Sequence, residues 1–260
     1  MNIATWNING VKARIEVLPA YLKEANPEII CLQEIKSVDE AFPSQVFEDL
    51  GYNVATHGQK GFNGVAILSK RPFEEVNPRL PGDESDEQAR YLEAVIGTDT
   101  GIVRVASIYL PNGNPVDTEK YPYKLAWMDR LITHAEGLLE LEEPLILAGD
   151  YNVIPQAQDC YSAEAWADDA LFKPETREKF RALCGLGLTD AVRSVRALGG
   201  DYTFWDYQAG AWQKNNGIRI DHLLLSPQAA DRLVSCEIDK YVRAWEKPSD
   251  HVPVKAEFAF

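Results

Sequence analysis

Hydrophobic residues occur along the chain mainly in runs of four to eight positions, rich in β-branched residues and separated by polar segments. Runs of this length, bounded by turn residues, indicate buried strands rather than helices. The predicted strands cover residues 3–6, 28–34, 64–69, 91–96, 103–110, 145–149, 219–226 and 252–258.

Three other segments repeat their apolar residues at helical spacing. The first covers 18–25 and stops before Pro27, and the second covers 125–139 and begins after Pro122. The third covers about 175–184. So many strands with so few helices do not fit the strict alternation of a doubly wound fold. The pattern favours an α/β protein in which two packed sheets carry helices on their outer faces, and without repeats or linkers we expect one domain, 1–260.

Polar side chains accumulate where the predicted strands end. Asp150 and Asn152 follow the strand 145–149 in LAGDYN, and an ionised acid beside a core strand is costly unless something compensates it. The other strand ends carry Asn7, Gln33, Glu34, Tyr109, Asn112, Asp250 and His251. If these ends converge, acids, amides, a phenol and an imidazole meet in one cleft.

Each of these residues also has a plainer interpretation. An Asp or Asn after a strand is usually a turn or cap residue, Glu34 could be a solvated loop acid, and Tyr109 could be a core tyrosine. Asp221 is different because it lies within an apolar strand, where an unpaired carboxylate is unfavourable. It needs a partner, and an Asp paired with a histidine fixes the tautomer of the imidazole.

The composition and net charge limit the kinds of partner that the protein can bind. The chain has 260 residues, 45% of them hydrophobic, and a formal net charge of -14. Such a charge opposes a polyanion unless basic residues are concentrated locally or cations intervene, and clustered carboxylates suit a hard cation such as Mg²⁺. No apolar run approaches the roughly 18 residues of a membrane span. With no signal-peptide pattern at the N-terminus and four scattered cysteines, we expect a cytoplasmic protein with reduced thiols.

The motifs together resemble one family. Seven motifs occur in a fixed order and spacing: TWNING, CLQEIK, HGQKGFNGVAILSK, YLPNG, LAGDYN, GIRIDHLLLS and KPSDHVPV. In this order and spacing they resemble the exonuclease III family of abasic-site DNA repair nucleases. The wider endonuclease/exonuclease/phosphatase superfamily, which includes DNase I and phosphoinositide phosphatases, shares several of them. The resemblance implies a DNase I-like four-layer α/β sandwich, with two packed, mainly antiparallel β-sheets flanked by helices.

The resemblance also implies a metal site and a catalytic group. Glu34 and Asn7 would hold Mg²⁺, or Mn²⁺ in its place, with Asp250 acting directly or through water. Asp150 would take a proton from the attacking water, and ionised Tyr109 is an alternative activator. Asn152 would donate an amide hydrogen bond, and Asp221 would orient His251 toward the phosphate. A second metal could use Asp150, Asn152 and His251, so one-metal and two-metal schemes stay open.

DNA contacts follow from the same resemblance. The residues expected to contact or position DNA are Asn9, Lys12, Lys60, Arg90, Asn112 and Arg219, and a local basic rim is enough for contacts to the phosphate backbone. Phe204 and Trp205 would line a pocket for a flipped abasic sugar, although a core position for Trp205 is equally compatible with the sequence. Ile218 stands where some relatives carry an aromatic residue.

We therefore expect a Mg²⁺-dependent DNA repair phosphodiesterase that cuts 5′ to abasic sites, with 3′→5′ exonuclease and 3′-end cleaning activity. Its partner would be double-stranded DNA with abasic sites or blocked 3′ ends, bound by a monomer without membrane contact. The alternatives are a hydrolase of another phosphoester and a non-catalytic nucleic-acid-binding regulator. The presence of Glu34, Asp150 and His251 argues against the regulator.

Overall fold

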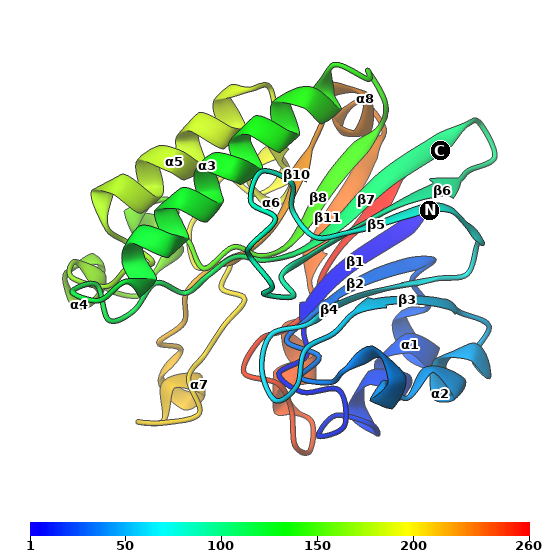
Figure 1. Ribbon diagram of the computed structural model, residues 1–260. Helices are drawn as coiled ribbons and strands as arrows, with labels where there is room; N and C mark the ends of the chain where they lie inside the picture. The colour runs from blue at the N-terminus through cyan, green and yellow to red at the C-terminus, as the bar shows by residue number, and fades with distance from the viewer.

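The computed structural model describes residues 1–260 as two six-stranded sheets packed face to face, with helices on the outside (Figure 1). The first sheet has the order β11–β12–β1–β2–β4–β3. Its strands are β1 (Asn2–Asn7), β2 (Ile29–Gln33), β3 (Asn53–His57), β4 (Val65–Ser69), β11 (Leu233–Ile238) and β12 (Val254–Phe258).

The second sheet has the order β5–β6–β7–β8–β10–β9. Its strands are β5 (Phe73–Pro78), β6 (Tyr91–Gly97), β7 (Ile102–Tyr109), β8 (Leu145–Asp150), β9 (Thr189–Asp190) and β10 (Asp221–Leu225). One pair in each sheet is parallel, β1 with β2 and β7 with β8, and every other pair is antiparallel. The predicted architecture of two mainly antiparallel sheets is confirmed.

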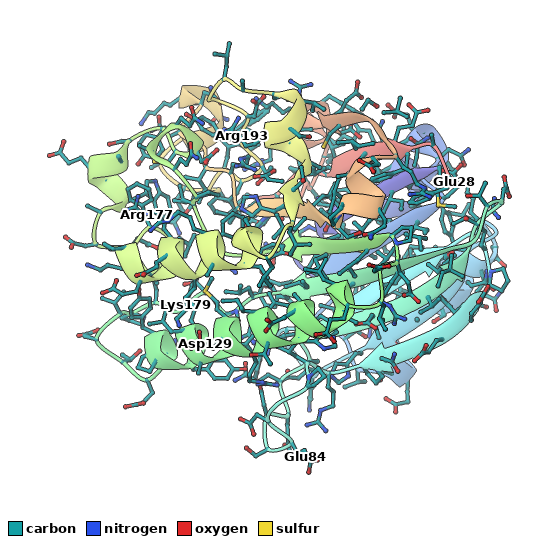
Figure 2. All side chains as sticks on the ribbon, turned by 90° about the horizontal axis from the view of Figure 1, so that it is seen from above. Glu28, Glu84, Asp129, Arg177, Lys179 and Arg193 are labelled. Atoms are coloured by element: carbon teal, nitrogen blue, oxygen red, sulfur yellow. The ribbon has the colours of Figure 1, made fainter.

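Two groups of helices complete the four layers. Helices α1 (Val17–Ala25) and α2 (Ser44–Glu48) cover the first sheet, and α3 (Lys120–Leu139) and α5 (Pro174–Gly185) cover the second (Figure 1). Figure 2 shows α3 and α5 side by side, where Lys179 of α5 pairs with Asp129 of α3. The shorter helices are α4 (Ala163–Trp166), α6 (Ala191–Val195), α7 (Ala211–Lys214) and α8 (Pro227–Ala230).

The core is layered in the same way. Ile67, Val105 and Leu223 belong to the apolar cluster between the two sheets. A second cluster packs the second sheet against α3 and α5, and a third packs the first sheet against α1 and α2. Most of the predicted strands are recovered because their residues are buried on both faces, which gives continuous apolar runs. Strand β12 instead alternates buried residues with the more exposed Lys255 and Glu257, a pattern that also indicates a strand. None of the helices combines the length and apolarity that a bilayer crossing needs.

Some elements differ from the prediction. Helix α3 begins at Lys120 and contains Pro122 in its first turn, where a missing N–H costs nothing because no intrahelical acceptor exists there. Strands β3, β5, β9 and β11 were not predicted. β5 is exposed over all but its first residue and β9 has only two residues, so neither produces a buried apolar run.

The topology gathers the polar strand ends at one edge. The two parallel pairs bring the carboxyl ends of β1 and β2, and of β7 and β8, to the same side, with Asn7 opposite Gln33 and Tyr109 opposite Asp150. Strand β10 runs antiparallel to β8 and starts at this edge, with Asp221 opposite Asp150. The convergence expected from the sequence therefore follows from strand order.

Candidate active site

Asp150 lies at the centre of this edge, at the carboxyl end of β8, and is 1% exposed. Its Oδ2 accepts a hydrogen bond from Asn7 Nδ2 (2.9 Å), and its Oδ1 accepts one from the backbone N–H of Asn152 (2.9 Å). Gly149 precedes it, and a Cβ there would lie 2.0 Å from the carbonyl oxygen of Ile108. The glycine of LAGDYN thus allows β7 and β8 to approach closely enough to place Asp150.

Asp221 and His251 form the pair that the sequence predicted. His251 Nδ1 lies 2.9 Å from Asp221 Oδ2, so the carboxylate fixes the imidazole and leaves Nε2 facing Asp150 Oδ2 at 3.7 Å. Thr203 Oγ1 donates to the same Asp221 oxygen at 2.6 Å. The other oxygen, Oδ1, is buried without a hydrogen-bond partner. His251 therefore lies between two buried carboxylates.

The carboxylates around His251 favour the protonated, positively charged form of its imidazole. Burial alone would lower the pKa of His251, but the charges of Asp221 and Asp150 outweigh it and raise the pKa above its usual range. Burial raises the pKa of Asp150, and the charge of Asp221 adds to the rise against the opposing effects of His251 and Asn7. A cation next to Asp150 would stabilise its ionised form.

Glu34 follows β2 in a left-handed conformation, with φ of 49°, which is uncommon for a residue other than glycine. Its Oε1 accepts from Asn7 Nδ2 at 2.9 Å, and its Oε2 lies 3.3 Å from Lys36 Nζ. Burial favours the neutral acid, but the hydrogen bond from Asn7 and the charges of Lys36 and His251 outweigh it and lower the pKa of Glu34. Asn7 therefore donates hydrogen bonds to two carboxylates, those of Glu34 and Asp150, and Glu34 is the one whose ionised form is favoured.

Asp250 and Asn9 extend the acidic side of the site. Asn9 Nδ2 donates to Asp250 Oδ1 at 3.0 Å, and Lys36 Nζ donates to Asn9 Oδ1 at 2.6 Å. Asp250 lines the same cleft as Glu34 and Asp150. Asn9 is engaged on both sides of its amide, and it links Asp250 to the loop that carries Glu34.

Tyr109 stands beside Asp150 at the end of β7. Burial and the nearby charges of Glu34 and Asp150 raise its pKa well above the usual range, so the phenol is protonated at neutral pH. The guanidinium of Arg90 stacks on its ring, 4.9 Å from the centroid. This charge distribution favours Asp150 over an ionised Tyr109 as the proton acceptor.

Asn152 does not use its side chain as the sequence suggested. Its Nδ2 donates to the carbonyl of Leu110 at 2.9 Å, and its Oδ1 accepts from Asn112 at 3.2 Å. Only its backbone N–H reaches Asp150. The left-handed φ of 47° at Asn152 makes that turn possible, so this residue positions Asp150 and the loop of Asn112.

These groups surround one cleft of about 290 Å³. Its polar wall contains Glu34, Tyr109, Asn112, Asp150, Asn152, Asp250 and His251. The rest of the lining combines the apolar side chains of Trp166, Leu171, Phe204, Ile218 and Ile220 with the polar residues Asn114, Asp169 and Asp206. Phe204 also packs edge-on against the imidazole of His251, with centroids 4.9 Å apart. The polar groups of the cleft thus lie beside apolar side chains.

Two predicted DNA-contacting residues are corrected by their burial. Arg219 is 1% exposed, and its guanidinium is held by Asp159 and Asp190, each at 2.8 Å, so it does not belong to a basic rim. Trp205 is fully buried, with its indole N–H donated to Asn215 Oδ1, and it does not line the cleft. Of the aromatic pair, only Phe204 faces the catalytic groups.

Lys12 and Lys60 do not lie in the cleft. Lys12 lines a separate cavity beside Trp245, and Lys60 is exposed in the loop 58–62. Arg90 is the one predicted cation next to a catalytic side chain, through its contact with Tyr109.

Two supporting residues were missed in the sequence. Thr203 holds Asp221, and Lys124 of α3 is fully buried, with its ammonium donating to the backbone carbonyls of Asn112 and Asn152 at 3.1 and 2.5 Å. Burial lowers the pKa of Lys124 to about 7. Lys124 precedes the predicted range 125–139, but the helix begins at Lys120 and places Lys124 on the same buried face as Met128 and Leu131, where a lysine needs a polar partner.

The residues present fit a metal ion. A hard divalent cation binds oxygen ligands. The site offers such oxygens on the carboxylates of Glu34, Asp150 and Asp250 and on the side-chain amide of Asn7. Ligand atoms of Asp150, Asp221 and His251 lie within 4.8 Å of one another, and Asp221 retains an unpartnered buried oxygen. A metal ion bound by Glu34 and Asn7 would lie next to Asp150, which is also a member of this cluster.

The strand ends of this DNase I-like sandwich bring together Glu34, Asp150 and the Asp221–His251 pair. This arrangement is typical of one class of protein, the metal-dependent phosphoester hydrolases. The comparisons with known proteins specify it further. Residues 4–251 match the endonuclease/exonuclease/phosphatase family, and the chain belongs to this family, among its DNA repair nucleases.

Individual relatives agree with this placement. Exodeoxyribonuclease III of Haemophilus influenzae is 36% identical over 99% of this chain and all of the relative. Among solved structures, a 3′ phosphatase from Neisseria bound to a product DNA hairpin superposes with a TM-score of 0.96 at 36% identity. An AP endonuclease from Archaeoglobus fulgidus superposes with a TM-score of 0.95 at 35% identity. Each structure and this chain cover one another completely.

Proposed function

We propose that this protein is a Mg²⁺-dependent DNA repair phosphodiesterase that cuts on the 5′ side of abasic sites and leaves a 3′-hydroxyl. The same site would remove nucleotides in the 3′→5′ direction and clean blocked 3′ ends. The substrate is double-stranded DNA carrying these lesions. The relatives named as exodeoxyribonuclease III, 3′ phosphatase and AP endonuclease support this range of activities.

One observation carries the proposal. Asn7 Nδ2 donates to both Glu34 and Asp150, and Asp150 in turn lies 3.7 Å from the imidazole that Asp221 holds. A metal-binding carboxylate, a base and a cationic hydrogen-bond donor are thus joined at one point. Hydrolysis of a phosphodiester needs these three components.

The residues would divide the chemistry as follows. Asp150 accepts the proton of the attacking water, for which a pKa raised toward neutrality suits a general base. His251, charged and oriented by Asp221, donates a hydrogen bond to a phosphoryl oxygen and offsets its developing charge. Tyr109, as a neutral phenol, donates to the phosphate or to the leaving oxygen. Asn152 and Asn112 position Asp150 and the phosphate-facing loop.

The metal is proposed as Mg²⁺, with Mn²⁺ able to replace it. When bound, it would polarise the phosphoryl group and offset charge on the leaving oxygen. Glu34 and Asn7 would hold it, and Asp250 would contact it directly or through water. Mg²⁺ keeps several waters and needs few protein carboxylates, which agrees with a site built around Glu34.

The binding partner and cellular setting belong to the same proposal. Lys60 and Arg90 would contact the DNA backbone beside the cleft, Asn9 and Lys12 would lie further along the duplex, and Phe204 would face the abasic sugar. Residues 1–260 would act as one catalytic domain and as a monomer, because one chain supplies every group of the cleft. We expect it to work in the cytoplasm.

A labelled duplex with one tetrahydrofuran abasic analogue tests the proposal. We expect a single cut immediately 5′ of the analogue in the presence of Mg²⁺ and no cut after chelation with EDTA. An intact duplex with a 3′-phosphate, measured in parallel, reports the 3′-end activity. Hydrolysis confined to lipid phosphoesters, or DNA binding without cleavage in Mg²⁺ or Mn²⁺, would refute it.

A further inference from the structure

A second cavity, of about 670 Å³, lies behind the active-site cleft. The segment 218–220 separates the two, because Ile218 and Ile220 line the cleft whereas Arg219 lines the second cavity. Alternate side chains of an extended segment point to opposite sides. The second cavity is therefore distinct from the catalytic site, although it shares one stretch of backbone with it.

Arginine side chains dominate the lining of this cavity. Arg177 and Arg181 come from α5, Arg193 comes from α6, and Arg219 closes the inner end. Figure 2 shows Arg177 and Arg193 on these two helices at the same end of the molecule. The chain as a whole is acidic, with a formal net charge of -14. The four arginines around this cavity therefore form a basic region on an acidic protein.

The acids in this region are already occupied. Asp159 Oδ1 accepts from Arg219 Nε and from Arg193, and its Oδ2 accepts from the backbone N–H of Gln156. Asp190 Oδ2 accepts from Arg219, and its Oδ1 accepts from the backbone N–H of Arg193. A third acid, Asp201, lies 3.4 Å from Arg193 Nη1. Three carboxylates against four guanidiniums still leave the cavity with a net positive charge, so it does not suit a cation.

Several guanidinium donors are unused. Arg181 makes neither a hydrogen bond nor an ion pair, and Arg177 uses only its Nε, on the carbonyl of Phe172. The hydrogen bonds of the buried Arg219 involve Nε and Nη1, which leaves Nη2 free. Arg193 Nε is buried without a partner. Guanidinium groups with free donors match the oxygens of a phosphate group, and Arg219, held by Asp159 and Asp190, is oriented in advance.

We propose that this cavity is an anion site that binds a phosphate group, either on a mononucleotide or in a nucleic-acid backbone. None of the arginines of this cavity lines the catalytic cleft. Arg219 and Arg193 form the fixed inner side of the site through their bonds to Asp159, and Arg177 and Arg181 supply the exposed side. Pro155, Ala157 and Phe180 add apolar surface against which the rest of a nucleotide packs.

The test measures binding of inorganic phosphate and of 5′-dAMP by isothermal titration, in EDTA so that metal-linked binding in the cleft is removed. The variant is Arg177→Gln with Arg181→Gln. The matched control is Lys173→Gln with Lys179→Gln, which removes the same charge from the same helix region without touching the cavity. Arg181→Gln alone provides a variant that loses no structural contact. Arginine Nε–H signals in NMR spectra locate the bound anion.

We expect the double arginine variant to bind phosphate and 5′-dAMP at least 10-fold more weakly than the wild type, and the lysine control to stay within about 2-fold, since each lost charge-assisted contact is of this order. Such a result assigns the site to small phosphate-bearing molecules. If only a single-stranded or duplex oligonucleotide binds more weakly to the arginine variant, the ligand is a nucleic-acid backbone. Equal binding of phosphate, 5′-dAMP and both oligonucleotides by the arginine variant and the lysine control would overturn the proposal.

Discussion

At the scale of single residues, burial and neighbouring charges determine which side chains of the site carry a proton. Asp150, Asp221 and His251 are all nearly inaccessible, and in such surroundings a charge persists only beside an opposite charge. The Asp–His–Asp arrangement satisfies this condition, with His251 Nδ1 2.9 Å from Asp221. An ionised base can therefore exist in a buried cleft.

Asp150→Asn tests the base directly. The amide retains the shape and the hydrogen bond to the backbone of Asn152 but cannot accept a proton, so we expect kcat for abasic-site incision to fall by about 10³-fold or more, near the upper range for losing a general base. Duplex binding should stay measurable. Asp168→Asn, at a fully exposed acid, is the matched control and should leave kcat unchanged. Incision by the Asp150 variant at the wild-type rate would contradict the assignment.

Tyr109→Phe distinguishes the two candidate activators. Because the pKa of Tyr109 is raised by burial and by the charges of Glu34 and Asp150, the phenol acts as a donor. Its loss should lower kcat by roughly 100-fold, the lower end of the cost of losing one donor to a developing charge. The pH dependence of kcat should keep its shape. A variant as inactive as Asp150→Asn would instead indicate that ionised Tyr109 activates the water.

At the scale of elements, the sequence predicts the strands that are buried on both faces and also β12, whose residues alternate between buried and more exposed positions. Strand β8 and strand β4 give uninterrupted apolar runs, because each is completely buried. Strand β11 pairs with only one neighbour, and it exposes Val234 and Glu237. At such an edge the apolar pattern no longer distinguishes a strand from a loop, so edge strands were missed.

The same reasoning explains which site residues could be predicted. Residues at strand ends could be predicted because they directly follow apolar runs and carry the motifs of the resemblance, and the two parallel pairs of the fold bring those ends to one edge. The orientation within the segment 218–220 could not be read from the sequence, since a one-residue change of phase moves Arg219 from one side to the other. Likewise, Phe204 and Trp205 point in opposite directions, and only the fold decides which one faces the cleft.

Glu93 of β6 gives a prediction for stability. It accepts hydrogen bonds from Arg104 Nη1 (2.7 Å) and Tyr91 (2.6 Å) and contacts His134 (3.0 Å). Burial would raise its pKa, but these partners outweigh burial and lower it to about 2. A depressed carboxyl pKa stabilises the fold above pH 4.5, and this stabilisation is lost as the pH falls from about 4.5 to 2.

We therefore expect Glu93→Gln to lower the free energy of unfolding at pH 7 by about 3 kcal/mol, the usual cost of breaking a buried pair. Near pH 2 the difference from the wild type should nearly disappear. Urea unfolding at both pH values measures this. Glu143→Gln removes the more exposed partner of Arg104 and should cost less. A constant difference at both pH values would show that Glu93 is not ionised in the fold.

At the scale of the whole molecule, a formal net charge of -14 opposes DNA at long range. Binding must then rely on a few cations beside the cleft and on the metal, which limits the number of counterions released from the duplex. The exposed loop 58–62, with Lys60, lies at the end of β3 near the edge where the site forms.

Lys60→Gln should weaken duplex binding to about the same degree for all sequences, because a phosphate contact carries no sequence information. The slope of log Kd against log salt should fall by about 1. Lys70→Gln, on a lysine whose partner is Asn26, is the control of equal charge and should leave the slope unchanged. An unaltered slope for the Lys60 variant would place that loop away from the DNA.

The first and last strands are neighbours, since β1 pairs with β12 and the amino group of Met1 donates to the carbonyl of Phe258 at 2.6 Å. Joining the two ends by a short Gly-Ser peptide would turn the polypeptide into a covalent ring without disturbing either strand. The ring restricts the unfolded chain more than the folded one, so we expect stabilisation on the order of 3 kcal/mol. The circular protein should keep full incision activity and unfold at a higher temperature than its linear precursor, which carries the same peptide uncyclised.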